Sequence, residues 1–238
     1  YEDAGATAIN HCAGDITSEI ITVSNVNTSQ AGTYSVSYTV EDSEGNPVSE
    51  ALRTVTVTDT QAPTLTLSGN LSVQVECGSA YTDAGASAVD DCDGDITNTI
   101  TVNSNLNTAA VGVYSATYTV ADASGNQAAE VVRTITVVDT APPVITMLEN
   151  PAVTVQCGAA YVDAGAVAAD ACDGDLTVGI TAAGMVNSAV PGVYTITYTV
   201  ADAAGNSAQE AVRTVTVVDT VSPVLLLTGS DVVTVECG

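Results

Sequence analysis

The sequence predicts an all-β protein built of tandem β-sandwiches that form an extended rod. Three observations predict it: a strict repeat of 80 residues, segments in which apolar and polar residues alternate, and proline at each repeat junction. A fixed period of this size is typical of a tandem array. Proline lacks a backbone donor and has a restricted φ, so these junctions favour a stiff rod over loosely linked beads.

The repeat has no insertion or deletion, so equivalent residues differ in number by 80 or 160. The residues shared by all three copies include Tyr1, Tyr81 and Tyr161; Cys12, Cys92 and Cys172; and Arg53, Arg133 and Arg213. Residues repeated in this way are expected to do the same job in each copy.

Strands are expected along most of each repeat. Residues 113–120 and 131–138 alternate with period two, which is typical of a half-buried strand. Residues 121–127, ADASGNQ, contain Asp followed by Gly-Asn and predict a hairpin turn between them. Shorter strands are expected at residues 100–103, 144–147 and 153–156, whereas residues 84–89 are either irregular or a short strand.

Domain boundaries are placed at the recurring junctions 59–63, 139–143 and 219–223. Cutting there predicts complete domains at 60–139 and 140–219, a domain at 1–59 that lacks its first strands, and the first strands of a following domain at 220–238. Residues 220–238 correspond to the first strands that the domain at 1–59 lacks.

The charge excludes several kinds of partner. The chain has 28 acidic residues against three arginines, a net charge of −25, so it is not expected to bind nucleic acid or anionic lipid. The same charge favours cation binding. No run of 18 apolar residues is present, so no membrane insertion is expected within this segment.

Several motifs together resemble a known family. They are Val-Glu-Cys-Gly-x-x-Tyr-x-Asp-Ala-Gly-Ala, Cys-Asp-Gly-Asp-Ile-Thr, Gly-Val-Tyr-x-x-x-Tyr-Thr-Val-x-Asp-x-x-Gly-Asn and Arg-Thr-Ile-Thr-Val-Val-Asp-Thr. The chain is similar over its whole length to the bacterial immunoglobulin-like surface repeat, first described in a pesticidal crystal protein and related to the hyalin repeat. The resemblance implies immunoglobulin-like β-sandwiches in tandem on secreted or surface proteins, without enzymatic activity.

The cysteines predict disulfides that tie the second strand of a domain to its acidic turn. Cys77 and Cys92 are 15 residues apart, as are Cys157 and Cys172, and each bond of this span is worth about 3 kcal/mol by loop entropy. The alternative pairs Cys12 with Cys77 and Cys92 with Cys157, across 65 residues. No zinc site is expected, because CxxC spacing is absent and the only histidine occurs in one repeat.

The short pairing leaves Cys12 and Cys237 without partners in the chain, so Cys237 is expected to bond the Cys12 equivalent of the next unit. That unit is a copy of the chain placed head to tail. It is either part of the same long polypeptide or a neighbouring subunit that receives residues 220–238 as donated strands.

The carboxylates allow two interpretations. Asp91, Asp93 and Asp95 alternate around a glycine, as in loops that bind hard cations, and Asp122 or Asp139 would complete a calcium site near the junction. The candidate calcium ligands in the two complete repeats are Asp91, Asp93, Asp95, Asp122, Asp139, Asp173, Asp175 and Asp202. In the other interpretation Asp-Gly-Asp is a turn whose last carboxylate bonds backbone amides or Arg133.

The arginines are expected to form structural ion pairs. Arg133 shares its alternation phase with Ile135 and Val137, so it is expected to lie partly inward and to pair with Asp95 or Asp122. Arg53 and Arg213 occupy the same position in the other repeats.

No nucleophile motif, repeated histidine or phosphate-binding loop suggests an enzyme. The predicted function is a structural extracellular or cell-surface fibre or adhesin stalk, in which each domain adds about 35–40 Å. The alternative is an adhesive module that binds glycan or protein at its loops. The near identity of the repeats favours the stalk, because a binding tip usually differs from its stalk.

Overall fold

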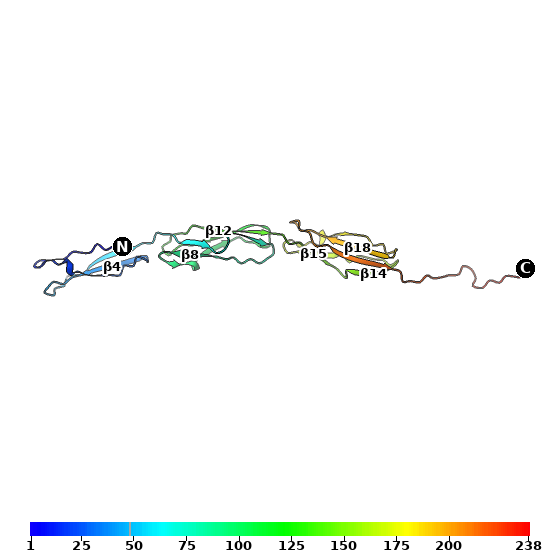
Figure 1. The fold of residues 1–238 in the computed structure, drawn as a ribbon, viewed down its shortest axis with the longest axis horizontal. Helices are drawn as coiled ribbons and strands as arrows, with labels where there is room; N and C mark the ends of the chain where they lie inside the picture. Colours follow the sequence, from blue (N-terminus) through cyan, green and yellow to red (C-terminus); the bar gives the residue numbers. More distant parts are fainter. Residues whose placement is uncertain (48) are drawn as a thin grey trace. The chain divides into compact units, whose positions relative to one another are not determined.

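The computed structural model describes residues 1–47 and 49–238 (Figure 1). The chain divides into two compact units. One comprises Tyr1–Val75, Ala80–Asn107 and Gly112–Val137, and the other Glu76–Ser79, Thr108–Val111 and Val138–Gly238. The division does not follow the 80-residue repeats, because the end of the second repeat packs with the third. Among the described residues, none of the helices has the length and apolar character that a membrane crossing requires.

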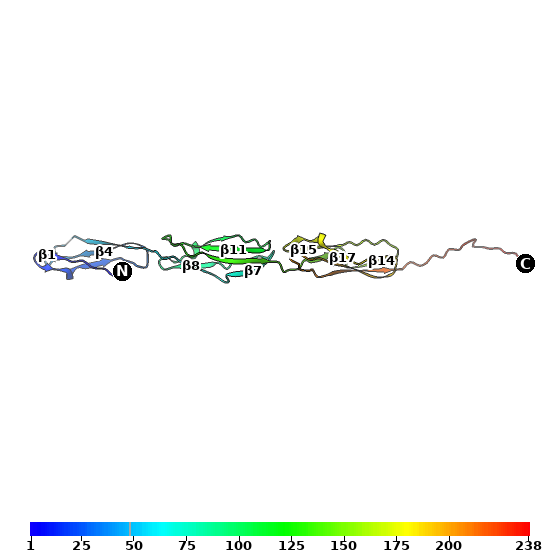
Figure 2. The ribbon, with the colours of Figure 1, turned by 90° about the horizontal axis from the view of Figure 1, so that it is seen from above.

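The second repeat, residues 60–139, contains two sheets (Figure 2). One has the strand order β10-β11-β12-β7 and the other the order β6-β8-β9. The elements are β6 (Thr64–Leu67), β7 (Ser72–Glu76), β8 (Ala86–Asp90), β9 (Gly94–Asp95), the 3-10 helix η2 (Thr97–Thr99), β10 (Thr101–Ser104), β11 (Gly112–Thr119) and β12 (Val131–Val138).

The third repeat has the same two sheets, ordered β14-β19-β18-β17 and β13-β15-β16. β14 runs parallel to β19, and the other neighbouring strands are antiparallel. The elements are β13 (Val144–Met147), β14 (Ala152–Gln156), β15 (Ala166–Asp170), β16 (Gly174–Asp175), η3 (Thr177–Gly179), β17 (Thr181–Ala183), β18 (Gly192–Thr199) and β19 (Ala211–Val218).

The first repeat has smaller sheets, ordered β3-β4-β5 and β1-β2. Its elements are β1 (Ile9–Asn10), β2 (Gly14–Asp15), η1 (Thr17–Glu19), β3 (Ile21–Ser24), β4 (Gly32–Thr39) and β5 (Ala51–Val57). Its described residues contain no counterparts of β6 and β7. At the other end of the sequence, the described residues 219–238 form no strand.

The core lies between the two sheets of a repeat. In the second repeat Ala116 and Tyr118 of β11 and Ile135 of β12 pack with Leu65 of β6, and all except Leu65 are fully buried. The alternation predicted for these strands is confirmed, because Arg133, Ile135 and Val137 of β12 all point inward. Apolar residues on one face of each sheet therefore produce the sandwich. The all-β prediction is confirmed.

The turn between β11 and β12 also has the predicted form. The amide of Asp122 donates to the carbonyl of Asn126 at 3.1 Å, and Ala121 pairs with Gln127 in an antiparallel bridge. Gly125 has a φ of 89°, a left-handed conformation that glycine adopts without steric cost. The turn places Asp122 at the end of the sandwich that the chain enters from the preceding junction.

Candidate functional site at the repeat junctions

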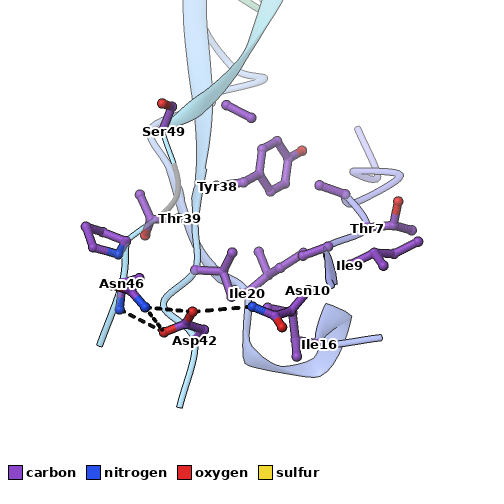
Figure 3. Close-up of a pocket in the computed structure, with 15 residues that line it drawn as sticks. Thr7, Ile9, Asn10, Ile16, Ile20, Tyr38, Thr39, Asp42, Asn46 and Ser49 are labelled. Carbon is purple, nitrogen blue, oxygen red and sulfur yellow. Dashed lines mark hydrogen bonds between the residues drawn. The ribbon is translucent and has the colours of Figure 1, made fainter. Parts of the chain in front are cut away.

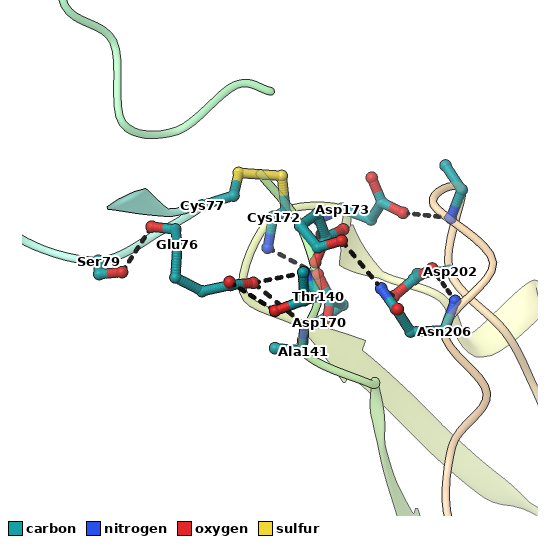
Figure 4. Close-up of a disulfide and its surroundings, with 12 residues drawn as sticks. Glu76, Cys77, Ser79, Thr140, Ala141, Asp170, Cys172, Asp173, Asp202 and Asn206 are labelled. Atoms are coloured by element: carbon teal, nitrogen blue, oxygen red, sulfur yellow. Dashed lines mark hydrogen bonds between the residues drawn. A yellow bond between two sulfur atoms is a disulfide. The ribbon is translucent and has the colours of Figure 1, made fainter. Parts of the chain in front are cut away.

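A disulfide joins the second and third repeats. Cys77 follows β7, Cys172 lies in the acidic turn after β15, and their Cα atoms are 5.3 Å apart (Figure 4). The two cysteines are separated by 95 residues, which is one repeat period more than the 15 residues of the predicted pairs. The predicted bonds Cys77–Cys92 and Cys157–Cys172 are therefore wrong. The alternative pairing, Cys12–Cys77 with Cys92–Cys157, is also wrong.

Strand direction explains the correction. In the third repeat β14 is parallel to β19, so Cys157 lies at the end from which the chain leaves the sandwich. β15 is antiparallel to β13, so Cys172 lies at the end where the chain enters. Two cysteines of one repeat are thus close in sequence but at opposite ends of the sandwich. Cys12, Cys92, Cys157 and Cys237 are not disulfide-bonded in this chain.

Glu76 holds the linker beside the disulfide. Its carboxylate accepts hydrogen bonds from the amide of Thr140 at 2.7 Å, the hydroxyl of Thr140 at 2.8 Å and the amide of Ala141 at 3.0 Å (Figure 4). These bonds from Thr140 and Ala141 lower the pKa of Glu76. The last residue of β7 is therefore tied to the first residues that lead into the next repeat.

Gly78 allows the two repeats to approach closely. Its φ is 76°, and a Cβ atom at this position would lie 2.8 Å from the carbonyl oxygen of Ala171. The equivalent Gly158 has nothing within 4 Å of that point. Gly78 is thus required both by its backbone conformation and by the acidic turn that packs on it.

Four carboxylates gather at the junction before the third repeat. Asp139, Asp170 and Asp202 each offer an oxygen within 4.8 Å of the others, and Asp139 also lies within this distance of Asp173. Burial and the nearby charges, Asp170 first, raise the pKa of Asp139. The side-chain amide of Asn206 donates to the carbonyl of Asp139 at 3.3 Å, which fixes the linker to the turn.

The junction before the second repeat has the same cluster. Asp59 lies within 4.8 Å of Asp90 and the Cys92 thiol, which form one group with it, and within 4.8 Å of Asp93 and Asp122, which form a second group with it. Asp90 is only 5% exposed, and its Oδ2 has no hydrogen-bond partner. The same holds for Oδ2 of Asp59. Burial and the negative charges of Asp59, Asp90, Asp93 and Asp91 raise the pKa of the Cys92 thiol.

The structure brings together some of the predicted calcium ligands and leaves others apart. Asp93, Asp122, Asp139, Asp173 and Asp202 lie in the two clusters. Asp91 lies outside them, as do Asp95 and Asp175, whose carboxylates accept the amides of Thr97 and Thr177 in local turns.

Asp59, Asp90 and Asp170 also lie in the clusters but were not among the predicted ligands. Asp59 carries the same signal as Asp139, because it repeats at the same place in the junction. Asp90 and Asp170 end β8 and β15, and repeat 1 has Asn10 at their position.

The arginines form ion pairs inside the sandwiches, but with a different partner from the one predicted. Arg133 is 1% exposed and pairs with Asp83 at 2.7 Å, whereas Asp95 and Asp122 do not contact it. Burial acts against ionisation of Asp83, but hydrogen bonds from Tyr118, Gly85 and Tyr81 hold the pKa of Asp83 below its usual value. Equivalent pairs join Arg213 to Asp163 and Arg53 to Asp3.

The first repeat has an open groove where the second has a covered core. The groove encloses about 380 Å³ and is lined by Ala8, Ile16, Ile20, Tyr38 and Val40 (Figure 3). In the second repeat Leu65 of β6 packs on the residues equivalent to Ala8, Ile16 and Val40. Arg53 is correspondingly 36% exposed.

Comparison with known proteins identifies the repeats. Residues 1–57, 65–137 and 145–217 match the family described as bacterial surface protein, Ig-like domain. The chain is 31% identical over 218 residues to hyalin of Strongylocentrotus purpuratus, covering 87% of this chain and 18% of hyalin. It is 36% identical over 135 residues to the pesticidal crystal protein Cry22Aa of Bacillus thuringiensis, covering 54% of this chain and 18% of that protein.

The chain thus spans about a fifth of the length of these relatives. Among solved structures, the M60 catalytic domain with the CBM51-1 and CBM51-2 domains from Clostridium perfringens ZmpB has a TM-score of 0.43 at 14% identity. That match covers 82% of this chain and 34% of that one. The resemblance found in the sequence is confirmed by the family match and by the similarity to hyalin and Cry22Aa.

Proposed function

Because the chain belongs to the family of bacterial surface proteins with Ig-like domains, we propose that it is a structural stalk segment of an extracellular or cell-surface protein. In this role it has no catalytic activity, and its repeats extend as a rod that holds another part of the protein away from the surface. The observation that carries the proposal is the disulfide between Cys77 and Cys172, which joins one repeat covalently to the next.

The contacts around the disulfide support the same role. Glu76 holds the linker at Thr140 and Ala141, and Gly78 lets the acidic turn of the third repeat pack closely on the second. A flexible string of domains would need none of these contacts. A stalk needs them, because each one limits bending between consecutive repeats.

The proposal includes head-to-tail continuation of the array by a following copy, either in the same polypeptide or as a neighbouring subunit. Leu225 and Leu227 correspond to Leu65 and Leu67 of β6 and are 93% and 75% exposed. In the second repeat those two leucines pack against the core. Residues 220–238 would supply the strands that cover the groove of the first repeat in the following copy.

Arg53 supports this arrangement. Arg133 and Arg213 donate to the carbonyls of Ser68 and Leu148, which follow β6 and β13. The equivalent position is Thr228, in the segment that would cover the groove. Arg53 of the following copy would thus gain the carbonyl that its counterparts already bond.

The observed disulfide also changes the expected bonds between copies. Cys77 bonds the acidic-turn cysteine of the next repeat, and Cys157 has the position of Cys77. Cys157 would therefore bond Cys12 of the following copy, and Cys237 would bond Cys92 of that copy. This register gives a partner to each of the four remaining cysteines and replaces the predicted bond between Cys237 and Cys12.

A divalent cation bound at the junctions, calcium in the first instance, would add to the stiffness of the stalk. A cation held between a linker carboxylate and the next repeat would restrict bending in the same way as the disulfide.

Electron microscopy of the oxidised chain tests the stalk. We expect thin, extended particles with about 35–40 Å for each repeat, the length of an eight- to ten-residue strand with its turns. Cys77→Ser should increase the bending between the second and third repeats, whereas Cys157→Ser should not. Compact particles, or equal bending in both variants, would overturn the proposal.

Peptide mapping of native material without reductant tests the register between copies. We expect the bonds Cys157–Cys12 and Cys237–Cys92. Recovery of a Cys237–Cys12 peptide instead would contradict the arrangement.

A further inference from the structure

We propose that each of the two junction clusters is a calcium site. The ligands are Asp59, Asp90, Asp93 and Asp122 at the first junction and Asp139, Asp170, Asp173 and Asp202 at the second. Binding of the ion stands on the geometry of these residues alone. Only its consequence, a stiffer junction, rests on the proposed function.

The first junction contains a buried carboxylate oxygen, Oδ2 of Asp90, that has no hydrogen-bond partner. Asp90 is 95% buried, its Oδ1 accepts the amides of Cys92 and Asp93, and its Oδ2 accepts nothing. Oδ2 of Asp59, in the same cluster, is also buried and unpartnered. Burying an unpaired carboxylate oxygen is costly unless a cation or a donor meets it.

None of the arginines of the chain supplies a positive charge to the junction carboxylates. The chain has three lysines and arginines in total, and all three are arginines paired with Asp3, Asp83 and Asp163. Each pair lies within a sandwich and away from the clusters. Neutralisation of the junction carboxylates therefore requires a cation or a proton from solution.

Backbone amides already hold two of the cluster carboxylates, Asp93 and Asp122, in a fixed orientation. The amide of Ala123 donates to Asp93 at 2.6 Å, and the amide of Asn126 donates to Asp122 at 2.8 Å. Donors that orient a ligand in this way lower the cost of assembling a metal site. The third repeat has the same contacts, from Ala203 to Asp173 and from Asn206 to Asp202.

The chemistry of the ligands favours calcium. Carboxylate oxygens suit hard cations, and Ca²⁺ accepts several carboxylates in flexible geometry, whereas Mg²⁺ usually keeps most of its waters. Cys172 lies beside Asp139 and Asp173, but its sulfur is bonded to Cys77 and is not available as a thiolate. A zinc–thiolate site is thus excluded at the second junction.

The first repeat provides a natural comparison. Asn10 stands in the position of Asp90, and Ala13 in that of Asp93. The side-chain amide of Asn10 donates to the Asp42 carboxylate at 3.3 Å. In the first repeat an amide thus donates a hydrogen bond to the neighbouring carboxylate at the position where the other repeats have a carboxylate. Asn is therefore a suitable substitute for testing the site.

Calorimetric titration of Ca²⁺ into the oxidised full chain tests the proposal, at about 0.15 M ionic strength, where exposed charges are screened. We expect two ions per chain, one for each cluster. Asp90→Asn and Asp170→Asn should each remove one of them, weakening that site at least tenfold, since loss of an outer partner alone costs about 10–100-fold. Magnesium at equal concentration should not displace the calcium.

Asp91→Asn is the matched control, because it removes the same charge from the same turn outside the cluster. It should leave two ions bound. Equal loss of binding in Asp91→Asn and Asp90→Asn would show only general attraction to a chain of charge −25 and would overturn the proposal, as would the absence of saturable binding.

Thermal unfolding in a chelator shows that the variants fold. Asp90→Asn should be at least as stable as the wild type there, because the substitution removes a buried unpaired carboxylate. Addition of calcium should then raise the midpoint of the wild type more than that of the variant. Compact particles in the microscope would overturn the stalk and leave this binding intact, so the two proposals fail separately.

Discussion

Cys77 and Cys172 are bonded across 95 residues, so the covalent link of this chain lies between repeats and not within one. Each repeat is a small sandwich whose core is centred on a few residues such as Tyr118 and Ile135. A bond that ends in the turn of the next repeat makes the stability of one repeat depend on its neighbour.

The first prediction concerns this bond. Cys77→Ser should lower the free energy of unfolding of the second and third repeats by about 2–4 kcal/mol, because it releases a long loop in the unfolded chain. Urea unfolding without reductant measures the difference. Cys157→Ser removes the equivalent thiol, which has no disulfide within the chain, and should leave the unfolding curve of the isolated chain unchanged. Equal effects of the two variants would contradict the prediction.

The second prediction concerns the buried arginines. Arg133→Met should destabilise the second repeat by about 3–5 kcal/mol, because it leaves Asp83 without its cation inside the sandwich. Arg53→Met makes the same change in the first repeat, where the arginine is 36% exposed, and should lower the stability less, because water screens the pair. Urea unfolding of both variants measures the loss in free energy of unfolding. A larger loss in Arg53→Met than in Arg133→Met would show that the exposure of the arginine does not determine the loss.

The third prediction concerns acid unfolding. The folded pKa of Asp83 is lower than its ordinary value of 3.8, so this group contributes stability above that pH and loses it as the pH falls through the folded pKa. Asp83→Asn should therefore be less stable than the wild type by about 1–3 kcal/mol at pH 7. The difference in stability between the wild type and Asp83→Asn should decrease as the pH is lowered below 3.8.

Thermal midpoints across the acid range measure this gap. The exposed Asp91→Asn variant should follow the wild-type curve. A gap between wild type and Asp83→Asn that stays constant down to pH 2 would mean that the carboxylate acts through packing and not through its charge.

The fourth prediction concerns the approach of the two repeats at Gly78. Both Gly78→Ala and Gly158→Ala place a side chain at positive φ, which costs about 1–2 kcal/mol. Only Gly78→Ala also brings a Cβ atom within 2.8 Å of the Ala171 carbonyl. It should therefore destabilise the protein more than Gly158→Ala does, by denaturant unfolding, and slow or prevent formation of the Cys77–Cys172 bond. Equal costs would indicate that the junction moves apart freely.

Much of each repeat could be predicted from local pattern. The alternation of residues 131–138 placed Arg133 on the inner face of β12, where it lies. The sequence Asp-x-x-Gly-Asn predicted the turn at Asp122, because glycine tolerates the left-handed conformation found at Gly125. Strand alternation and turn formation depend on residues only a few positions apart in the sequence, so they can be predicted without the tertiary structure.

The candidate site could be predicted only in part. Asp93 and Asp122 were expected in one site and lie in one cluster, whereas Asp139, the alternative to Asp122, lies in the cluster of the other junction. Asp90 was not expected, because it ends a strand and shows no turn pattern. Its place in the site follows from the direction of β8, which carries its last residue back toward the preceding junction.

By itself, the sequence determined the period, the family of the repeats, the strand pattern and the equivalence of residues such as Cys77 and Cys157. The tertiary structure decided which cysteines and carboxylates meet. Cys77 is closer in sequence to Cys92 but is bonded to Cys172, because parallel and antiparallel strand pairs carry the two cysteines of one repeat to opposite ends of the sandwich. The number of residues between two cysteines does not say whether they are close in space. The direction of the strands that precede them decides which end of the sandwich each cysteine reaches.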